Sequence, residues 1–301
     1  MGLFLACLLF LAVPAGKARA ETIGVILTRG VQYYADINTE LMKAVQSRRE
    51  GIKFIIQRPY PDADSWGNAA RKFTGSNVSA IITYGASPAE AVINEHPRVP
   101  VIYAGVYAPA AGPLKGKNVT GVRTSLPVAS LMRYLRDIIK PGKMGIIYNS
   151  LEADSSMEFK EIASAAEKYG MKPAGLDLRN SPDATSLLAE SSFSALCITG
   201  CSTVEPVYSK ILMMMKERNI PVISLVYDRQ RQPLISLYAA PEDQGRLAAG
   251  LLLSALKRAS AKGVPAAESR QYFLIYNFRD SASMGLRTSL GLVTDATEVI
   301  Y

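Results

Sequence analysis

Short apolar runs of strand length alternate with longer amphipathic runs along nearly the whole chain. The short runs are bounded by polar or glycine-containing loops, and the longer runs carry apolar residues at helical spacing. The expected strands cover residues 23–27, 52–57, 80–84, 101–104, 144–148, 173–178, 195–199, 222–225, 234–238 and 272–276. The expected helices include residues 37–48, 128–139, 159–169, 207–218 and 244–258. Strands that alternate with helices in this way predict an α/β fold with parallel sheets and right-handed crossovers.

Two of the expected strands have similar sequences, TIGVIL at residues 22–27 and KMGIIY at residues 143–148. Each run is a buried-strand signal followed by a polar loop and the start of a helical pattern. Since this unit opens a parallel α/β domain, its repetition predicts two Rossmann-like lobes with a ligand cleft between them. The boundary between the lobes is expected near residues 118–122, after a loop rich in alanine, proline and glycine.

The first 20 residues have the pattern of a signal peptide. Residues 3–13 are almost wholly apolar, but this run is shorter than a membrane span of about 20 residues. The run leads to Ala18-Arg-Ala20, a small-x-small pattern, so cleavage is expected before Glu21. The alternative is a lipoprotein acceptor at Cys7, before which the apolar stretch is short. The mature product is expected to be soluble in the periplasm or another extracytoplasmic space.

Composition and charge narrow the class of protein. The chain has 301 residues, of which 49% are hydrophobic and 20% charged, which suits two globular lobes with real cores. Its net charge of +8 becomes +6 once Lys17 and Arg19 are removed with the signal peptide. This surplus is spread thinly, without a run of basic residues, and therefore gives no support for nucleic acid as a partner.

Cys197 and Cys201 are the cysteines that remain after the signal peptide. Four residues of extended strand span about 13 Å, whereas a disulfide needs Cα atoms within about 7 Å. Only a sharp turn at Gly200 would allow a bridge, and the alternative places Cys197 in the core and Cys201 on the following loop. The single histidine, His96, lies far away in sequence, so no metal site is expected.

Three serines stand at apparent helix starts directly after strands, each with a glutamate three residues later. The pairs are Ser87 with Glu90, Ser155 with Glu158, and Ser202 with Glu205, and each has the spacing of a capping box. Plain helix capping explains the pattern. The position at the carboxyl ends of strands also favours a ligand site, because helix N-termini there offer free N–H groups to an anion. We expect a ligand carboxylate to meet backbone N–H groups near Ser87 or Ser155.

Catalytic signatures are scarce in this sequence. The Gly-x-Ser-x-Gly elbow, the dinucleotide fingerprint and the phosphate loop are all missing, so no enzyme activity or cofactor is expected. One enzymatic alternative is a two-lobed amino-acid racemase, since residues 200–203 are similar to a cysteine loop of such enzymes. The matching loop at residues 84–88 carries Ser87 instead of the second thiol, and a proton shuttle needs both thiols.

Several segments resemble one known family. They are residues 83–91, 99–106, 118–122, 145–149 with 152–155, 285–287 and 295–300. These segments are similar in kind and order to substrate-binding proteins of ABC transporters of the tryptophan/tyrosine type. The resemblance implies a type I periplasmic-binding fold, with lobe 1 formed by residues 21–120 and 240–268 and lobe 2 by residues 121–239 and 269–301. The family usually has Asp-Pro where this chain has Ala108-Pro109, and an Asp-Asn-Thr-like loop at residues 201–203.

Tyrosines and polar residues at or just beyond the expected strand ends are the candidate ligand-binding residues. Aromatic rings there could stack on a ligand or be plain packing residues, and acidic groups could hold an ammonium. The candidates are Arg29, Tyr33, Tyr34, Tyr84, Ser87, Tyr107, Asn149, Asp154, Ser155, Cys201, Thr203, Tyr227 and Asp228.

The resemblance and the absence of catalytic groups together indicate a function. We expect a monomeric, exported solute-binding component of an ABC importer, which captures an aromatic or branched amino acid between its lobes by hinge closure. Its partners would be the small-molecule ligand and the membrane permease and ATPase of the transporter. The alternative is a sensory protein of the same fold that passes its signal to a receptor.

Overall fold

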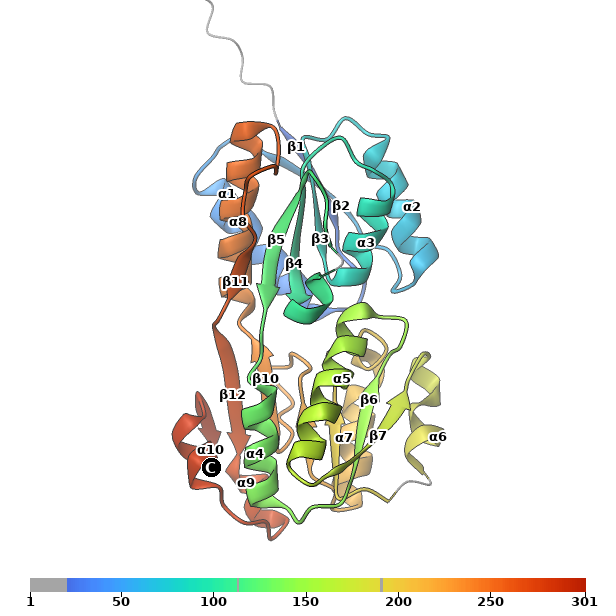
Figure 1. The fold of residues 1–301 in the computed structure, drawn as a ribbon, viewed down its shortest axis with the longest axis vertical. Coiled ribbons are helices and arrows are strands. Elements are labelled where there is room, and N and C mark those ends of the chain that lie inside the picture. Colours follow the sequence, from blue (N-terminus) through green and yellow to red (C-terminus); the bar gives the residue numbers. More distant parts are fainter. Residues whose placement is uncertain (1–20, 113, 190–191) are drawn as a thin grey trace, which may run out of the picture.

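The chain folds into two α/β lobes stacked along the long axis of the molecule (Figure 1). The computed structural model describes residues 21–112, 114–189 and 192–301. The signal-peptide prediction for residues 1–20 lies outside this part of the chain. Within it, no helix is both long enough and apolar enough to cross a membrane.

The first lobe is built on a six-stranded, all-parallel sheet with the strand order β11-β5-β4-β3-β1-β2. Its strands are β1 (Thr22–Ile26), β2 (Lys53–Gln57), β3 (Ala80–Tyr84), β4 (Val101–Tyr107), β5 (Val119–Thr124) and β11 (Ala267–Ser269). Its helices are α1 (Gln32–Gln46), α2 (Ala63–Thr74), α3 (Ala86–Asn94), η1 (Ala108–Ala111) and α8 (Pro241–Arg258). Ile23 and Val25 pack against α1 and α8, while Ile26 packs against α2 on the opposite face. Both faces of the sheet are therefore covered, which explains why its strands are almost wholly apolar.

The second lobe contains a seven-stranded sheet with the order β13-β12-β10-β9-β8-β6-β7. Its strands are β6 (Lys143–Tyr148), β7 (Lys172–Asp177), β8 (Ala195–Ile198), β9 (Val222–Ser224), β10 (Ile235–Ala239), β12 (Tyr272–Asn277) and β13 (Glu298–Ile300). Its helices are α4 (Val128–Ile138), α5 (Ala153–Lys168), η2 (Ser181–Asp183), α6 (Ala184–Ala189), η3 (Glu205–Val207), α7 (Tyr208–Glu217), α9 (Phe278–Ser283) and α10 (Leu290–Asp295). Helices α4 and α5 cover one face of the sheet, and α6 and α7 cover the other.

The prediction of an α/β fold with two parallel-sheet lobes is confirmed, except that β12 and its parallel neighbour β13 run opposite to the other strands of the second sheet. Strand β12 runs antiparallel to β10. Strand β10 runs toward the first lobe and is followed there by α8, whereas β12 returns from the first lobe after β11 (Figure 1). The two strands must therefore cross their sheet in opposite directions.

Three segments connect the lobes: residues 125–127 between β5 and α4, residue 240 between β10 and α8, and residues 270–271 between β11 and β12. The lobe boundary expected at residue 120 falls inside β5, whose pairing with β4 continues to Thr124. The boundary expected near residue 268 falls within β11, one residue before its end.

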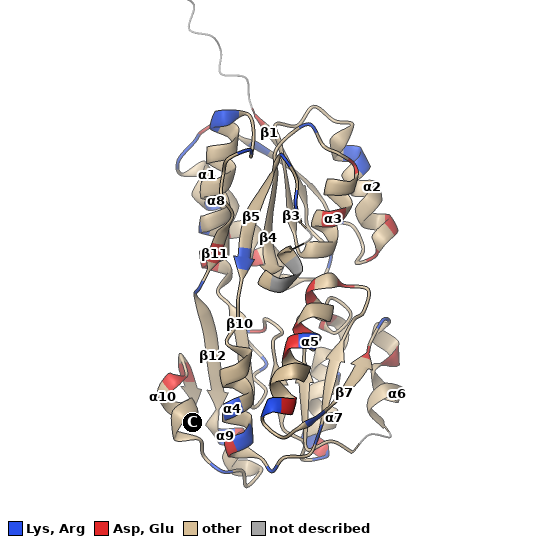
Figure 2. Ribbon diagram, viewed as in Figure 1, with Lys and Arg blue, Asp and Glu red and all other residues tan. Residues whose placement is uncertain are grey.

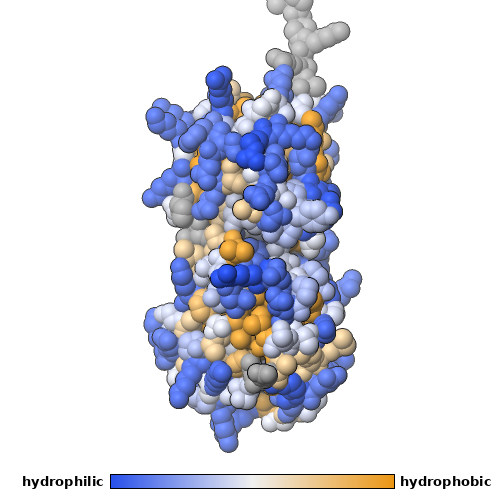
Figure 3. All heavy atoms as spheres, turned by 90° about the vertical axis from the view of Figure 1, so that its right-hand side faces the viewer, coloured by the Kyte–Doolittle hydropathy of each residue, from blue (hydrophilic) through white to orange (hydrophobic). Residues whose placement is uncertain are grey.

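The charged residues are distributed over both lobes without a single-sign face in the view of Figure 2. Acidic residues mark the first turns of α5, at the junction of the lobes (Figure 2). From the side, hydrophilic residues cover most of the surface, and apolar residues appear between them (Figure 3).

Candidate ligand site

A cavity lies at the junction of the lobes, at the carboxyl ends of β4, β6, β8, β9 and β10. Its volume is about 70 Å³, and all the empty space between the lining atoms, open solvent included, is about 660 Å³. The first lobe and the crossing segments contribute Val31, Tyr33, Tyr34, Gly105, Tyr107, Thr124, Leu126 and Ala239. The second lobe contributes Glu152, Asp154, Glu158, Gly200, Cys201, Ser202, Glu205, Leu225, Val226, Tyr227 and Tyr238. This is the edge of an α/β sheet at which ligands bind.

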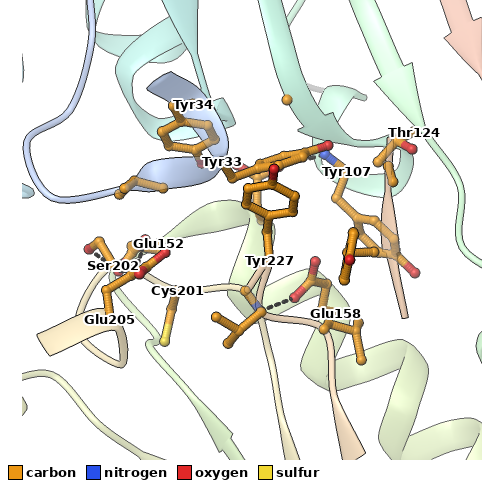
Figure 4. Close-up of a pocket in the computed structure, with 18 of the residues that line it drawn as sticks. Tyr33, Tyr34, Tyr107, Thr124, Glu152, Glu158, Cys201, Ser202, Glu205 and Tyr227 are labelled. Carbon is orange, nitrogen blue, oxygen red and sulfur yellow. Dashed lines mark hydrogen bonds between the residues drawn. The ribbon is translucent and has the colours of Figure 1, made fainter. Parts of the chain in front are cut away.

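Tyrosine rings form much of the wall (Figure 4). Tyr33 and Tyr34 come from the first turn of α1, and Tyr107 ends β4. The ring centroids of Tyr33 and Tyr227 lie 5.6 Å apart across the lobe junction. Tyr238 meets the ring of Tyr227 edge-on at 5.1 Å. These distances are typical of favourable aromatic pairs, so the wall is apolar in its body and polar at its hydroxyl groups.

Asp154 at the start of α5 links the two lobes. Its Oδ2 accepts a hydrogen bond from the backbone N–H of Ala86 at 2.6 Å, and its Oδ1 accepts one from the N–H of Tyr107 at 2.7 Å. In return, the N–H of Ala153 donates to Oγ of Ser87 at 3.1 Å. Gly85 leaves room for Tyr34, because a Cβ there would lie 2.5 Å from the Tyr34 hydroxyl oxygen, and its φ of +86° favours glycine.

Two further carboxylates hold the loop after β8. Oε2 of Glu158 accepts the N–H of Gly200 at 2.8 Å. Glu152 accepts the N–H of Ser202 at 3.2 Å and its hydroxyl at 2.8 Å. The N–H groups that a ligand carboxylate would seek at these loops therefore already donate to protein carboxylates.

Burial raises the pKa of each of these acids above its ordinary value, because removal from water disfavours the charged form. The pKa of Asp154 rises to about 7; the N–H groups of Ala86 and Tyr107 oppose the rise, and the nearby charge of Glu152 adds to it. The pKa of Glu205 also rises to about 7, mainly by burial. Burial raises the pKa of Glu158 well above its usual range. The cavity is thus a place where additional negative charge is unfavourable.

The capping-box predictions are wrong at all three serines. Helix α3 begins at Ala86, so Ser87 lies inside the first turn and bonds to the other lobe instead. Helix α5 begins at Ala153, which places Ser155 within the helix, where its Oγ accepts the N–H of Asn149. The 3₁₀ turn η3 begins only at Glu205 and has no side-chain cap, while Ser202 donates to Glu152.

The structure brings six of the candidate ligand-binding residues to the cavity wall, namely Tyr33, Tyr34, Tyr107, Asp154, Cys201 and Tyr227. Ser87 borders a smaller hollow that shares Tyr34, Glu152, Asp154 and Ser202 with the main cavity. The other candidates, Arg29, Tyr84, Asn149, Ser155, Thr203 and Asp228, lie outside its lining.

Each residue outside the lining has another structural role. Arg29 is exposed and donates to the hydroxyl of Tyr60 at 2.9 Å. Tyr84 is fully buried and donates to Asn38 at 3.1 Å. Asp228 accepts two backbone N–H groups of its own loop and pairs with Arg231.

The remaining three form a buried network beneath the cavity. The hydroxyl of Ser155 bonds that of Thr199 at 2.7 Å, and the hydroxyl of Thr203 donates to the carbonyl of Leu178 at 2.8 Å. The Asn149 side chain donates to Glu152 at 3.0 Å. These contacts position the acidic residues rather than face the cavity.

Of the four acids in the cavity wall, sequence analysis identified Asp154 and missed Glu152, Glu158 and Glu205. Glu158 and Glu205 were visible as the last residues of the supposed capping boxes, but were assigned to helix capping. Glu152 follows a strand end closely enough to have been a candidate. Thr124 ends β5 and Leu126 lies in the connecting segment that follows, and no local pattern identifies such residues as ligand-facing.

Both cysteines are free and buried. Cys197 is a core residue, and Cys201 lines the cavity. Burial raises the pKa of the Cys201 thiol to about 12, so the thiolate that a racemase needs as its base is unfavourable near neutral pH. Across the described ranges, no group of three or more His, Cys, Asp or Glu residues is arranged to hold a metal ion.

Two α/β lobes with three connections and a cavity at their facing strand ends define the type I periplasmic-binding class. Residues 51–300 match the model of a family described as ABC transporter substrate binding protein. The chain therefore belongs to this family, as the resemblance of its segments predicted.

Individual relatives are distant. A tyrosine-binding protein of Clostridioides difficile is 22% identical over 206 residues, which cover 66% of this chain and 57% of that protein. A Streptococcus pneumonia ABC domain solved in complex with L-Trp has a TM-score of 0.82 at 16% identity, covering 92% of this chain and 100% of that one. A conserved domain protein of Vibrio cholerae has a TM-score of 0.83 at 18% identity, and the match covers 93% of this chain and 100% of that one. At such identities the structural matches establish the fold.

Proposed function

We propose that this chain is the exported solute-binding component of an ABC importer, which captures a small amphipathic ligand between its lobes and delivers it to a permease and ATPase. The observation that carries the proposal is the cavity, which is lined by residues of both lobes and by Leu126 of a connecting segment. A ligand enclosed there touches both lobes at once, and it therefore stabilises their closed arrangement.

Aromatic amino acids are the first ligands to test. The wall contains five tyrosines, whose rings suit a planar apolar body and whose hydroxyl groups suit its polar end. Two relatives carry names that mention tyrosine and L-Trp. The cavity volume of about 70 Å³ suits a few waters, so binding of a ligand of amino-acid size requires separation of the lobes or movement of the tyrosines.

A thermal-shift screen of residues 21–301 against amino acids and other small metabolites tests the proposal. A ligand at 100 times its dissociation constant raises the free energy of unfolding by about 2.7 kcal/mol, which shifts the melting temperature measurably. Uptake of the labelled ligand by cells with and without the gene then distinguishes import from sensing. A flat response to every compound in the screen would contradict the proposal.

Export is the second part of the proposal. The motif at residues 18–20 supports cleavage by a signal peptidase. N-terminal sequencing of the protein recovered from the extracytoplasmic fraction should begin at Glu21. An unprocessed chain confined to the cytoplasm would be the contrary result.

A further inference from the structure

The cavity wall is acidic and has no matching basic residue. Its carboxyl groups belong to Glu152, Asp154, Glu158 and Glu205, and among the described residues none of its side chains is Lys, Arg or His. Figure 4 shows Glu152, Glu158 and Glu205 beside the tyrosine rings, drawn with their carboxyl groups near the hollow. A ligand in this cavity meets acids and aromatic rings, and no positive side chain.

Two arginines that follow the wall residue Tyr227 in sequence form ion pairs outside the cavity. Arg229 pairs with Glu242, and its guanidinium carbon lies 5.6 Å from the ring centroid of Tyr227. Arg231 pairs with Asp228 at 2.6 Å. Neither residue lines the cavity. Among the described residues that line the cavity, a ligand carboxylate would therefore meet no cationic side chain.

Backbone donors are also occupied. The N–H groups of Ala86 and Tyr107 donate to Asp154, and that of Gly200 donates to Glu158. The N–H of Ser202 donates to Glu152. A ligand carboxylate would have to displace a protein carboxylate from these groups, and the displaced acid would remain in a site that already disfavours its charge.

Two buried polar groups at the wall have room for a ligand. Glu158 is only 8% exposed, and within the described residues its Oε1 has no hydrogen-bond partner. The hydroxyl of Tyr33 is buried and also has no partner there. Burial disfavours the ionised form of Glu158, whose Oε1 can only accept, so a cationic donor placed there would both fill the free acceptor and stabilise the ionised form. A protonated amine supplies such a donor together with the positive charge that the wall lacks.

We propose that the cavity selects a protonated amine that carries no carboxylate, in preference to the zwitterionic amino acid with the same apolar body. The ammonium lies against Glu158 and Asp154, and the apolar body lies against the rings of Tyr33 and Tyr227. The rings assist, because their faces attract cations. This inference rests on the proposed solute-binding function and narrows its ligand class.

The test uses two matched sets of ligands with the wild-type protein and isothermal titration calorimetry. The aromatic set is tyramine, tyrosine and 4-hydroxyphenylpropionate; the aliphatic set is isoamylamine, leucine and 4-methylvalerate. In at least one set the amine should bind ten times more tightly than the amino acid or better, and the carboxylic acid should bind most weakly. An amino acid or carboxylic acid that binds as tightly as its amine, or the absence of binding by all six compounds, overturns the inference.

Variants of helix α5 supply the matched control. Glu158→Gln retains a side-chain acceptor for Gly200 but removes the charge, and it should weaken amine binding at least tenfold without weakening that of the carboxylic acid. Glu167→Gln makes the same change at an exposed position of α5 and should leave all affinities unchanged. Equal effects of the two variants, or an equal loss for amine and acid, overturn the inference. If the metabolite screen identifies another ligand but none of the six compounds binds, the ligand class inferred here is wrong and the solute-binding function stands. If the screen identifies no ligand, the proposed function is wrong as well.

Discussion

At the scale of single residues, protein carboxylates take the place that sequence analysis assigned to a ligand's carboxylate. Asp154 follows a strand end, and this position made it a visible candidate. Its two bonds to backbone N–H groups of the other lobe depend on how the lobes meet, which residue spacing does not contain. Burial between the lobes explains the raised pKa of Asp154, because it removes the carboxyl group from water, while the two N–H groups oppose the rise.

This raised pKa predicts that stability falls as pH rises through neutrality. The pKa of Asp154 is raised from 3.8 to about 7, so the native protein keeps a proton that the unfolded chain has released between these values. The resulting stabilisation is complete below pH 3.8 and is lost as pH rises through 7. Burial of Asp154 and the charges of Glu152 and Glu90 cause the shift.

Urea unfolding at pH 5.5 and pH 8 measures the effect. The contribution of Asp154 to the free energy of unfolding should decrease by about 2 kcal/mol between these pH values. Asp154→Asn should show a correspondingly smaller decrease than the wild type. Identical pH profiles for the two proteins would show that Asp154 ionises normally.

At the scale of elements, strands were easier to predict than helix starts. All ten expected strands are present, because continuous apolar runs mark them, and their ends differ from the expected ones by at most three residues. Short edge strands β11 and β13 have no such run. Helix α5 begins at Ala153 instead of residue 159, since its polar first turns lack apolar periodicity; these turns carry the acidic wall.

Two glycines of α8 provide a matched test of element packing. A Cβ at Gly245 would lie 2.7 Å from the Ile37 carbonyl oxygen and 2.9 Å from the Leu41 nitrogen, both in α1, whereas a Cβ at Gly250 would meet nothing within 4 Å. Gly245→Ala should therefore force the helices apart and lower the free energy of unfolding by about 1–3 kcal/mol. Gly250→Ala should raise it by about 0.5–1 kcal/mol, because alanine favours the helix.

Denaturant titration of both variants gives the comparison. Stabilisation by both substitutions would mean that α1 and α8 are not in close contact in solution.

At the scale of the whole molecule, two lobes were predictable from the repeated strand openings and the family resemblance. Their closed arrangement was not, because it is held by contacts between residues distant in sequence. Besides Asp154, the hydroxyl of Tyr107 donates to Glu161, and that of Tyr227 donates to Asp36 at 2.6 Å. Each of these pairs joins one lobe to the other.

Removal of the Asp154 contacts should open the ligand-free protein. Hydrogen bonds to charged groups contribute about 1.5–3 kcal/mol each, so Asp154→Ala shifts the balance away from the closed arrangement. Small-angle X-ray scattering should report a larger radius of gyration for Asp154→Ala than for the wild type. The double variant Asp154→Ala with Tyr227→Phe should have a larger radius of gyration than Asp154→Ala alone. Glu167→Ala, at an exposed position of the same helix, is the control. Unchanged scattering in all variants would mean that other contacts hold the lobes together.

Helix α8 has a consequence for the order of folding. Ala248, Ala249 and Leu252 of α8 complete the core in which Ile37 and Leu41 of α1 are buried. Synthesis starts at the N-terminus, and α8 begins only at Pro241. Every element from β1 to β10 is therefore synthesised before α1 can pack against α8. Until α8 is available, the apolar face of α1 stays exposed to solvent. A contact between segments so far apart in the sequence also forms slowly. The first half of the chain, although its elements are made first, is expected to be the last part to become stable.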